Sequence, residues 1–178
     1  MSEDLTPTVL RLDEFDAGPE SMTRRWSVFS DRVMGGVSHV RGVMTTAYGR
    51  YALHLTGDVS LEQNGGFLQA ACSLGNPPGS GVDARGFRGV VLSVCGAPGS
   101  YFVHLRTADT RAPWQYYGAP LLVSHDWMQV MLSWDAFTPV SLATPLDVSC
   151  IVRIGIVAAK TAFHADVALS ALGLSAGD

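Results

Sequence analysis

Apolar and polar residues alternate with a period of two along most of this chain, and no other feature restricts its fold as much. Between residues 51 and 61, Tyr51, Leu53 and Leu55 share one face of an extended chain, which is typical of a half-buried strand. The same period predicts further strands at residues 67–73, 89–94, 101–107, 127–133, 151–158 and 163–172. The last of these is rich in Ala and Leu and could form a helix, but its strict alternation favours a strand.

Turn-forming residues separate these segments. Gly, Pro and Asp cluster at residues 75–86, 96–100 and 107–113, and no segment has the period of a long amphipathic helix that could connect parallel strands. Short strands joined by turns indicate an all-β fold, an antiparallel β-sandwich of the jelly-roll type. The 178 residues, of which 47% are apolar, suit a single domain over residues 1–178, because a chain of this length buries roughly 70% of its unfolded surface.

Net charge and cysteine content limit the classes of binding partner and the cellular compartment that we expect. The net charge is -4 at pH 7, whereas binding to nucleic acid or anionic lipid needs clustered Lys and Arg, so we expect no nucleic-acid partner. Cys72, Cys95 and Cys150 are widely spaced in apolar surroundings and are predicted to be buried, reduced thiols. The acidic N-terminal segment lacks a signal sequence, and no apolar run is long enough for a membrane span. We therefore expect a cytoplasmic protein.

The sequence contains no motif for metal, cofactor or catalytic chemistry. The five histidines are scattered, without the short spacings of a transition-metal site, and calcium stays open only because jelly rolls can bring oxygen ligands together from separate loops. No cysteine adjoins a histidine, and no GxSxG elbow occurs. We therefore predict no cofactor and no catalytic activity. An enzyme built from dispersed residues such as Asp58, His104 and Arg106 is the weakest alternative.

One predicted strand carries an unusual combination of polar side chains. In residues 101–107, Phe102, His104 and Arg106 lie on the face opposite to the apolar residues. A buried and unpaired guanidinium group costs several kcal/mol, so Arg106 must reach solvent, pair with a carboxylate or line a cleft. We expect this face to be a binding surface rather than dry core.

An aromatic segment follows shortly after this strand. Trp114, Gln115 and Tyr116 combine flat apolar rings with hydrogen-bonding groups, the mixture that binds sugars or protein partners. In a sandwich such rings more often fill the edge of the core, so a binding role and a packing role both stay open at this point. The other tryptophans are expected in the core; they are Trp26, Trp127 and Trp134.

Two glycine pairs interrupt the strand pattern, in "SDRVMGGVS" (30–38) and "EQNGGF" (62–67). An Asx turn at Asp31 and positive φ angles at the glycines account for a bend in the first segment, and we expect Asp31 to accept the hydrogen bonds that fix it. Asn64-Gly65 is a preferred dipeptide for a tight hairpin between the strands on either side. Neither pair has the spacing or the following helix of a phosphate site.

Taken together, these motifs resemble those of the complex I intermediate-associated protein 30 family. The resembling segments are collinear over about residues 9–172 and are "WSVFSDRVMGGVS" (26–38), "GDVSL" (57–61) with "NGGF" (64–67), "YFVHLRT" (101–107), "WMQV" (127–130) with "FTP" (137–139), and "IGI" (154–156). The signature positions carry Asp31, Met34, Gly35, Gly36, Ser38, Asn64, Gly65, Gly66 and Phe67, and Arg106 matches a characteristic strand arginine. The two glycine motifs are specific in combination.

The resemblance implies a galactose-binding-domain-like β-sandwich, in agreement with the strand pattern. It also implies the role of the family's mitochondrial members, which are chaperones that hold assembly intermediates of respiratory complex I (NADH:ubiquinone oxidoreductase) and are not catalysts. Our leading hypothesis is a non-enzymatic binding protein that offers one sandwich face and its rim loops to a protein partner, such as a respiratory-chain assembly intermediate. The alternative is a carbohydrate-binding or small-ligand-binding module in which Trp114, Tyr116 and Arg106 line a concave face.

Overall fold

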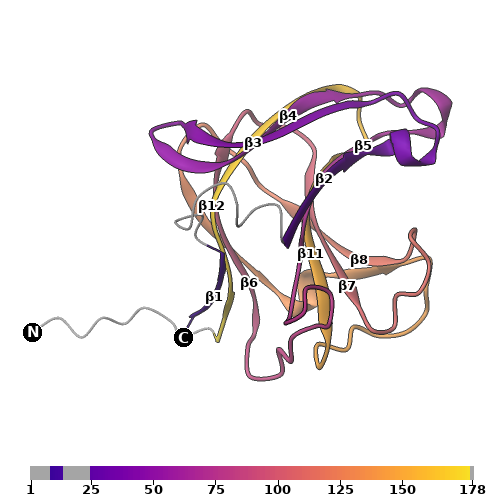
Figure 1. The fold of residues 1–178 in the computed structure, drawn as a ribbon, viewed down its shortest axis with the longest axis vertical. Helices are drawn as coiled ribbons and strands as arrows, with labels where there is room; N and C mark the ends of the chain where they lie inside the picture. The colour runs from indigo at the N-terminus through magenta and orange to yellow at the C-terminus, as the bar shows by residue number, and fades with distance from the viewer. Residues whose placement is uncertain (1–8, 14–24, 177–178) are drawn as a thin grey trace, which may run out of the picture.

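Two antiparallel β-sheets pack face to face in the computed structural model of the chain, which describes residues 9–13 and 25–176 (Figure 1). The first sheet has the order β3-β4-β12-β6-β9, with β1 paired to the C-terminal end of β12; the second has the order β10-β8-β7-β11-β5-β2. The first sheet's strands are β1 Val9–Asp13, β3 His39–Ala47, β4 Arg50–Val59, β6 Gly89–Gly96, β9 Met128–Ser133 and β12 Phe163–Ser175. The second sheet's strands are β2 Trp26–Ser30, β5 Phe67–Ser73, β7 Tyr101–Thr107, β8 Tyr116–Leu121, β10 Thr138–Val140 and β11 Ile151–Ala159. The prediction of an all-β antiparallel sandwich is confirmed.

In β7 and β8, for example, alternate residues point into the space between the sheets and belong to the main core. Along β7, Tyr101, Val103 and Leu105 are buried, whereas the residues between them are half-buried on the outer face. Leu53 and Leu55 of β4 enter the same core from the first sheet. The segment at residues 163–172, for which a helix was the alternative, is part of strand β12. Burial of one face of each sheet is therefore the physical reason for the period of two.

The tryptophans divide between the core and its surroundings. Trp26 is buried, as predicted. Trp134 is half-buried against the main core, and its indole N–H donates to the Phe87 carbonyl oxygen at 2.8 Å. The prediction for Trp127 is wrong: it packs on a separate small cluster that includes Ala52, outside the main core, and donates to the carbonyl of Tyr48. An amphipathic indole can bury its ring on small residues while its N–H stays paired near solvent.

The predicted hairpin at the second glycine pair is wrong. Strands β4 and β5 belong to different sheets and are not paired with each other, so the loop between them crosses from one sheet to the other. Within this loop, Glu62–Asn64 form the short 3-10 turn η2, in which Gln63 has a φ of 56°. The backbone N–H groups of Gly66 and Phe67 bind the carboxylate of Asp31, and this partner replaces the cross-strand pairing that a hairpin would need.

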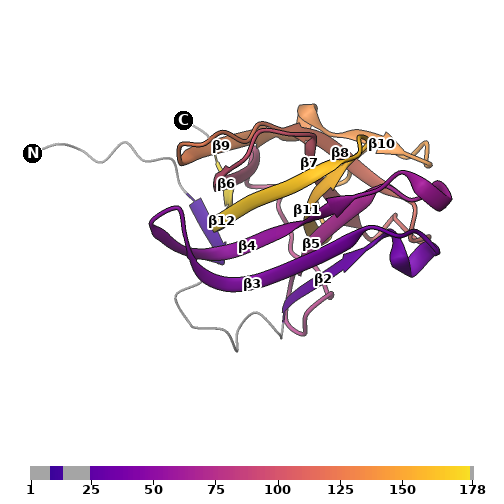
Figure 2. The same ribbon diagram turned by 90° about the horizontal axis from the view of Figure 1, so that it is seen from above.

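The turns that follow β2 and β4 lie close together at one end of the sandwich. Figure 2 shows this end, together with β3, β4 and β12 side by side in one layer. The turn after β2 is η1, which spans Asp31–Met34. Among the described residues, no helix is long and apolar enough to cross a membrane. Of the acidic N-terminal segment, the structure describes residues 9–13 in β1, whereas residues 1–8 and 14–24 lie outside the described residues.

The three cysteines are free thiols in the structure. Cys72 and Cys95 are buried, as predicted, whereas Cys150 is half-buried. Burial raises the pKa of the Cys72 thiol to about 12. A thiol that stays protonated at neutral pH is a poor nucleophile, so Cys72 acts as a core residue.

Candidate functional site

Asp31 joins the two glycine loops. Its side chain is only 1% exposed. Its Oδ1 atom accepts a hydrogen bond from the Ser38 N–H at 2.9 Å, and Oδ2 accepts from the Ser38 hydroxyl group. Oδ2 also accepts from the N–H of Gly66 and, at 3.2 Å, from the N–H of Phe67. The expectation that Asp31 accepts the hydrogen bonds that fix the bend is confirmed, and its donors come from both loops. The predicted Asx turn at Asp31 is wrong, because these donors lie seven or more residues away; the local turn is closed instead by the Ser30 hydroxyl group, which accepts from the Arg32 N–H at 3.3 Å.

The carboxylate of Asp31 also explains why glycine occupies both loops. A Cβ atom at Gly36 or Gly65 would fall against the Asp31 carboxyl group. Gly35 ends the turn η1 with a φ of 87°, in the left-handed region that favours glycine. The two glycine pairs of the sequence are therefore halves of one structure.

Hydrogen bonding keeps Asp31 ionised. Burial raises the pKa of the Asp31 carboxyl group, but the hydrogen bonds from Ser38, Gly66 and Phe67 outweigh burial and hold the pKa below its ordinary value of 3.8. Ser38 extends the network, since its hydroxyl oxygen accepts from the Ser60 N–H at 2.8 Å. Both oxygens of this carboxylate thus accept hydrogen bonds from the described backbone and side chains.

A groove of about 830 Å³ crosses the outer face of the second sheet next to these loops. Outward-facing side chains of the sheet form its floor, and Phe29 of β2 and Val157 of β11 are examples. Val33, Met34 and Leu61 form one wall, in the two loops that Asp31 joins. The volume lies within the range of about 300–1,000 Å³ that is typical of ligand sites.

The outer face of β7 contributes to this groove. His104 and Arg106 line it, and Phe102 lies beside it, with the Lys160 ammonium group 4.5 Å from its ring centroid. The His104 ring stacks on Tyr116 with centroids 3.8 Å apart and an interplanar angle of 15°. Burial, assisted by the charge of Lys160, lowers the pKa of His104 to about 4. The imidazole is therefore neutral at pH 7.

The aromatic segment after β7 lies at the opposite wall. Trp114 is 59% exposed at the rim of the groove, so the packing interpretation does not hold for it. Gln115 does not line the groove; its side-chain Oε1 accepts from the N–H groups of Arg111 and Ala112 in its own loop, and its side-chain Nε2 donates to the Ser141 carbonyl oxygen at 3.2 Å. Arg106 donates to the carbonyl of Pro113 in the same loop at 3.1 Å. Gln115 and Arg106 thus hold this loop against the sheet.

Sequence patterns missed two cationic residues of the groove. Arg153 of β11 lines it, with its guanidinium carbon 5.0 Å from the centroid of the Phe29 ring, and Lys160 lines it at the end of the same strand. The missed signal is a single arginine in the otherwise apolar run "IVRIGIVA" (151–158). Such a residue must find solvent, a partner or a cleft for the same reason as Arg106.

The structure does not bring the dispersed catalytic candidates together. His104 and Arg106 lie in the groove, but Asp58 is exposed on β4 of the other sheet, where it contacts His164 at 2.8 Å. Side chains from strands far apart in the sequence can line one surface only if the strands belong to the same sheet. The sequence alone did not show that β4 and β7 belong to different sheets. Asp58 therefore cannot act together with His104 and Arg106, and the catalytic group proposed from these three residues has no carboxylate.

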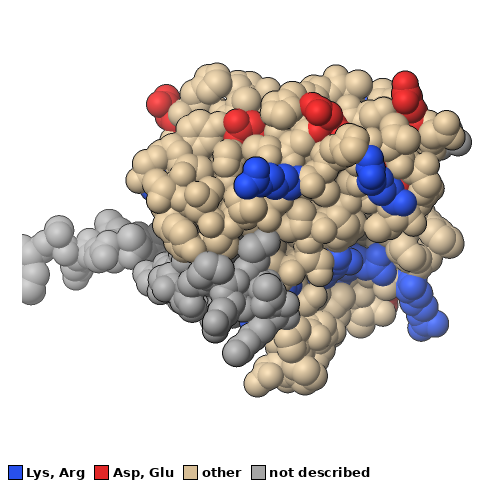
Figure 3. All heavy atoms as spheres, turned by 45° about the horizontal axis from the view of Figure 1, so that its top comes forward, with Lys and Arg blue, Asp and Glu red and all other residues tan. Residues whose placement is uncertain are grey.

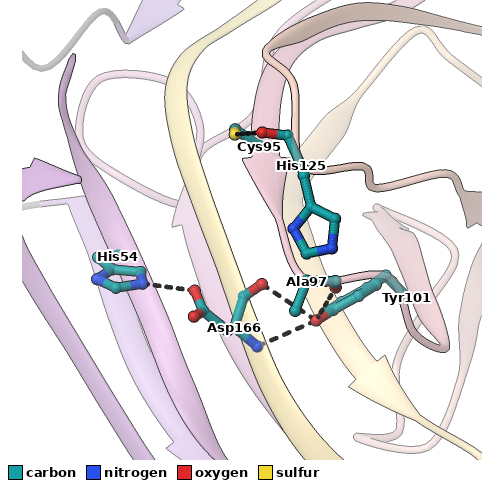
Figure 4. A network of polar contacts seen from close by, with 6 residues as sticks. All are labelled: His54, Cys95, Ala97, Tyr101, His125 and Asp166. Atoms are coloured by element: carbon teal, nitrogen blue, oxygen red, sulfur yellow. Dashed lines mark hydrogen bonds and ion pairs between the residues drawn. The ribbon is translucent and has the colours of Figure 1, made fainter. Parts of the chain in front are cut away.

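A second polar cluster links β12 to its neighbours (Figure 4). His54 Nε2 lies 2.6 Å from an oxygen of Asp166, and the Tyr101 hydroxyl accepts from the Asp166 N–H at 3.0 Å and donates to the carbonyl of Ala97 at 2.9 Å. The nearby Cys95 is buried, and burial raises the pKa of its thiol. Because this cluster contains no activated nucleophile, we interpret it as structural.

Charged groups are sparse on the surface shown in Figure 3, where the acidic side chains lie along the upper edge and basic side chains lie below them. Within residues 9–13 and 25–176, no group of three or more His, Cys, Asp or Glu residues could hold a metal ion. The described residues therefore form a groove but no metal-binding cluster.

The comparison with known protein families agrees with this arrangement. Residues 15–170 match the model of the complex I intermediate-associated protein 30 family. The chain belongs to this family. The matched residues include both glycine loops, β7 and β11, and therefore the floor and both walls of the groove. A search of curated proteins found none that is similar in sequence.

Solved structures with a similar fold include carbohydrate-binding modules. The family 11 module of the cellulosomal cellulase Lic26A-Cel5E of Clostridium thermocellum matches with a TM-score of 0.72 and 13% identity, over 96% of this chain and 95% of that chain. The family 30 module of the cellulosomal cellulase Cel9D-Cel44B of Clostridium thermocellum has a TM-score of 0.57 and 14% identity, over 78% and 83%. The agarase AgWH50C has a TM-score of 0.66 and 11% identity, over 96% of this chain and 25% of its own. At these identities the likeness shows the jelly-roll fold alone.

Proposed function

We propose that the protein is a non-catalytic binding protein that holds a segment of a protein partner in the groove on its second sheet. Its membership in the complex I intermediate-associated protein 30 family supports a role like that of complex I assembly factors. The partner in this proposal is a subunit or an assembly intermediate of the respiratory chain.

One observation carries the proposal: the loops that bear the family signature also build a wall of the groove. Asp31 fixes these loops, and Met34 and Gly66 of the signature line the groove. The same wall exposes large apolar side chains, because Val33 is 69%, Met34 is 64% and Leu61 is 50% exposed. A cluster of exposed apolar side chains beside a groove is typical of an interaction site.

The chemistry of the wall fits a polypeptide. Methionine and aliphatic side chains adapt to the side chains of a partner protein, and Trp114 across the groove provides a large amphipathic ring of the kind found at binding hot spots. A stable complex buries on the order of 800 Å² on each partner. The partner would therefore also contact the rim loops.

Affinity purification tests this proposal. In cells that make the protein, the tagged wild type should recover complex I subunits or assembly intermediates. Met34→Asp places a charge on the groove wall and should lower this recovery by roughly tenfold or more, because a buried unpaired charge is costly at an interface.

Leu122→Asp is the matched control. Leu122 is 68% exposed and does not line the groove, so this variant adds the same charge elsewhere and should recover the partner as well as the wild type does. The proposal is contradicted if no respiratory-chain protein is enriched by the wild type, or if both variants lose the partner equally.

Carbohydrate binding is the second candidate, and a specific observation favours it. The exposed ring of Trp114 and the stacked pair of His104 and Tyr116 offer flat surfaces on which sugar rings can stack. A structural relative is a carbohydrate-binding module solved with a β-1,3-1,4-mixed-linked tetrasaccharide. Calorimetry with that tetrasaccharide discriminates between the candidates. Saturable binding that Trp114→Ala abolishes would support the sugar, whereas no binding supports the protein partner.

A further inference from the structure

Two arginines lie side by side in the floor of the groove. Arg106 of β7 and Arg153 of β11 are paired across neighbouring antiparallel strands, and both line the groove. Both are half-buried. Like charges opposite each other on neighbouring strands destabilise a sheet. The fold alone therefore does not account for this pair.

Neither arginine has a carboxylate partner in the described chain. Arg106 donates to the carbonyl oxygens of Pro113 and Thr110, at 3.1 and 3.4 Å, and Arg153 lies over the ring of Phe29. Carbonyl oxygens and an aromatic face satisfy part of a guanidinium group but neutralise none of its charge. Burial lowers the pKa of both arginines, and the charge of Arg106 lowers that of Arg153 further.

The groove as a whole is cationic. Arg106, Arg153 and Lys160 line it, whereas the single carboxylate among its lining residues is Asp31. The oxygens of Asp31 are taken by hydrogen bonds within the two loops. His104 adds no charge at pH 7. A positive groove on a chain with a net charge of -4 indicates selectivity for an anionic ligand.

The arginines lie in the middle of a longer depression. A second hollow of about 360 Å³ adjoins the groove and shares Arg106, Pro113 and Arg153 with it, and it continues to Ser73 and Gly79. A ligand that contacts both arginines can therefore extend in two directions. This shape suits an extended chain better than a compact anion.

On these grounds we propose that the groove binds an extended acidic segment of a polypeptide, whose carboxylates pair with Arg106 and Arg153 and whose apolar side chains contact Val33, Met34 and Leu61. The inference rests on the proposed function and specifies the chemistry of the partner. Arg binds carboxylates in a bidentate manner through its planar fork. This wall favours a polypeptide over an acidic sugar, because sugar rings stack on aromatic faces, and three of the four exposed large apolar side chains at this groove are not aromatic.

Calorimetry with a defined peptide tests the inference. The probe is an acetylated and amidated octapeptide that carries two glutamates two residues apart between two leucines, because alternate residues of an extended chain share a face. Its counterpart carries glutamine in place of glutamate. The acidic peptide should bind roughly tenfold more tightly than the glutamine peptide, and its affinity should fall as salt screens the charges.

Variants of the arginines locate the effect. Arg153→Gln should weaken binding of the acidic peptide by roughly tenfold or more, and Arg153→Lys should restore only part of it, because lysine keeps the charge but loses the fork. Arg41 is an exposed residue of β3 in the other sheet, so Arg41→Gln is the matched control and should change the affinity by less than about twofold. Circular dichroism should show that all variants stay folded.

The outcomes separate this inference from the proposed function. Equal binding of the acidic and glutamine peptides overturns the inference, as does an unchanged affinity in Arg153→Gln. Tighter binding of tetragalacturonate than of the acidic peptide also overturns it, in favour of an acidic sugar. If Met34→Asp abolishes recovery of a respiratory-chain partner from cells but Arg153→Gln does not, the inference fails while the proposed function stands.

Discussion

Replacement of Asp31 by asparagine should destabilise the fold strongly, although asparagine has nearly the same shape. In its better orientation the amide oxygen occupies the Oδ2 position and keeps the donors from Ser38, Gly66 and Phe67. Its NH2 group then faces the Ser38 N–H, which loses its acceptor. An unpaired buried N–H costs about 1–3 kcal/mol, and the other three bonds drop from charge-assisted to neutral strength. We expect a total loss of about 2–4 kcal/mol.

Urea unfolding followed by tryptophan fluorescence measures this loss. For a chain of this length the expected decrease in melting temperature is about 5–15 °C. Asp83→Asn is the matched control, since Asp83 is exposed and pairs with the exposed Arg85; it should leave the unfolding free energy nearly unchanged, because an exposed ion pair contributes little to stability. If Asp31→Asn also changes it by less than about 0.5 kcal/mol, the assignment of Asp31 as the link between the loops is refuted.

The pH dependence gives an independent check on the same residue. The pKa of Asp31 in the folded state lies below 3.8, so its contribution is fully present above the ordinary carboxyl pKa and is lost as the pH falls through the lower pKa of the folded state. The difference in unfolding free energy between wild type and Asp31→Asn should therefore be constant from about pH 5 to 7 and shrink below about pH 4. A difference that grows on acidification would contradict the assigned pKa.

Three further predictions concern residues around the groove and the core. Gly36→Ala should lower the unfolding free energy by about 1–3 kcal/mol, because its Cβ would fall against the Asp31 carboxyl group; Gly86→Ala, which meets no atom within 4 Å, should lower it by less than about 0.5 kcal/mol in the same urea titration. In an NMR titration, the His104 ring should be protonated with a midpoint near pH 4. The unfolding free energy of the wild type should fall as the pH falls from about 6.5 toward 4, and His104→Gln should lack this part of the decrease. A titration midpoint near pH 6.5 would contradict the burial of the ring. Cys72 should react with a thiol reagent at pH 8 only after unfolding, as judged by mass spectrometry, and rapid labelling of Cys72 in the native protein would show that it is not a core residue.

The strands were predictable because burial of one sheet face imposes a period of two on the sequence. Strands β8 and β10 were not predicted, because each contains a proline, which is typical of turns rather than strands. The prolines are Pro120 in β8 and Pro139 in β10. Both prolines are tolerated for a physical reason. Pro139 is tolerated because β10 is the edge strand of its sheet. Pro120 is tolerated because β10 pairs with β8 only up to Gly118, so no strand lies beside Pro120 on the β10 side to accept a hydrogen bond from an N–H group.

The site was predictable where it depends on one strand and unpredictable where it depends on several. The alternation in the sequence of β7 predicted that His104 and Arg106 lie on the same face of the strand. In the structure both side chains line the groove. The dipeptide Asn64-Gly65 suggested a hairpin, because local rules cannot show that Asp31, far away in the sequence, binds the N–H of Gly66. Likewise, the order of strands in the two sheets depends on the whole fold. This order places Arg153 beside Arg106 and puts Asp58 in the other sheet, away from the groove.

Site-specific photo-crosslinking tests most directly that the groove of the second sheet is the partner-binding site. A benzophenone amino acid replaces either Trp114, which is 59% exposed at the rim of the groove, or Leu122, which is 68% exposed and lies outside it. Illumination of cells that make these variants should attach respiratory-chain subunits to the protein from position 114 and not from position 122. Adducts from position 122 alone, or from neither position, would contradict the account.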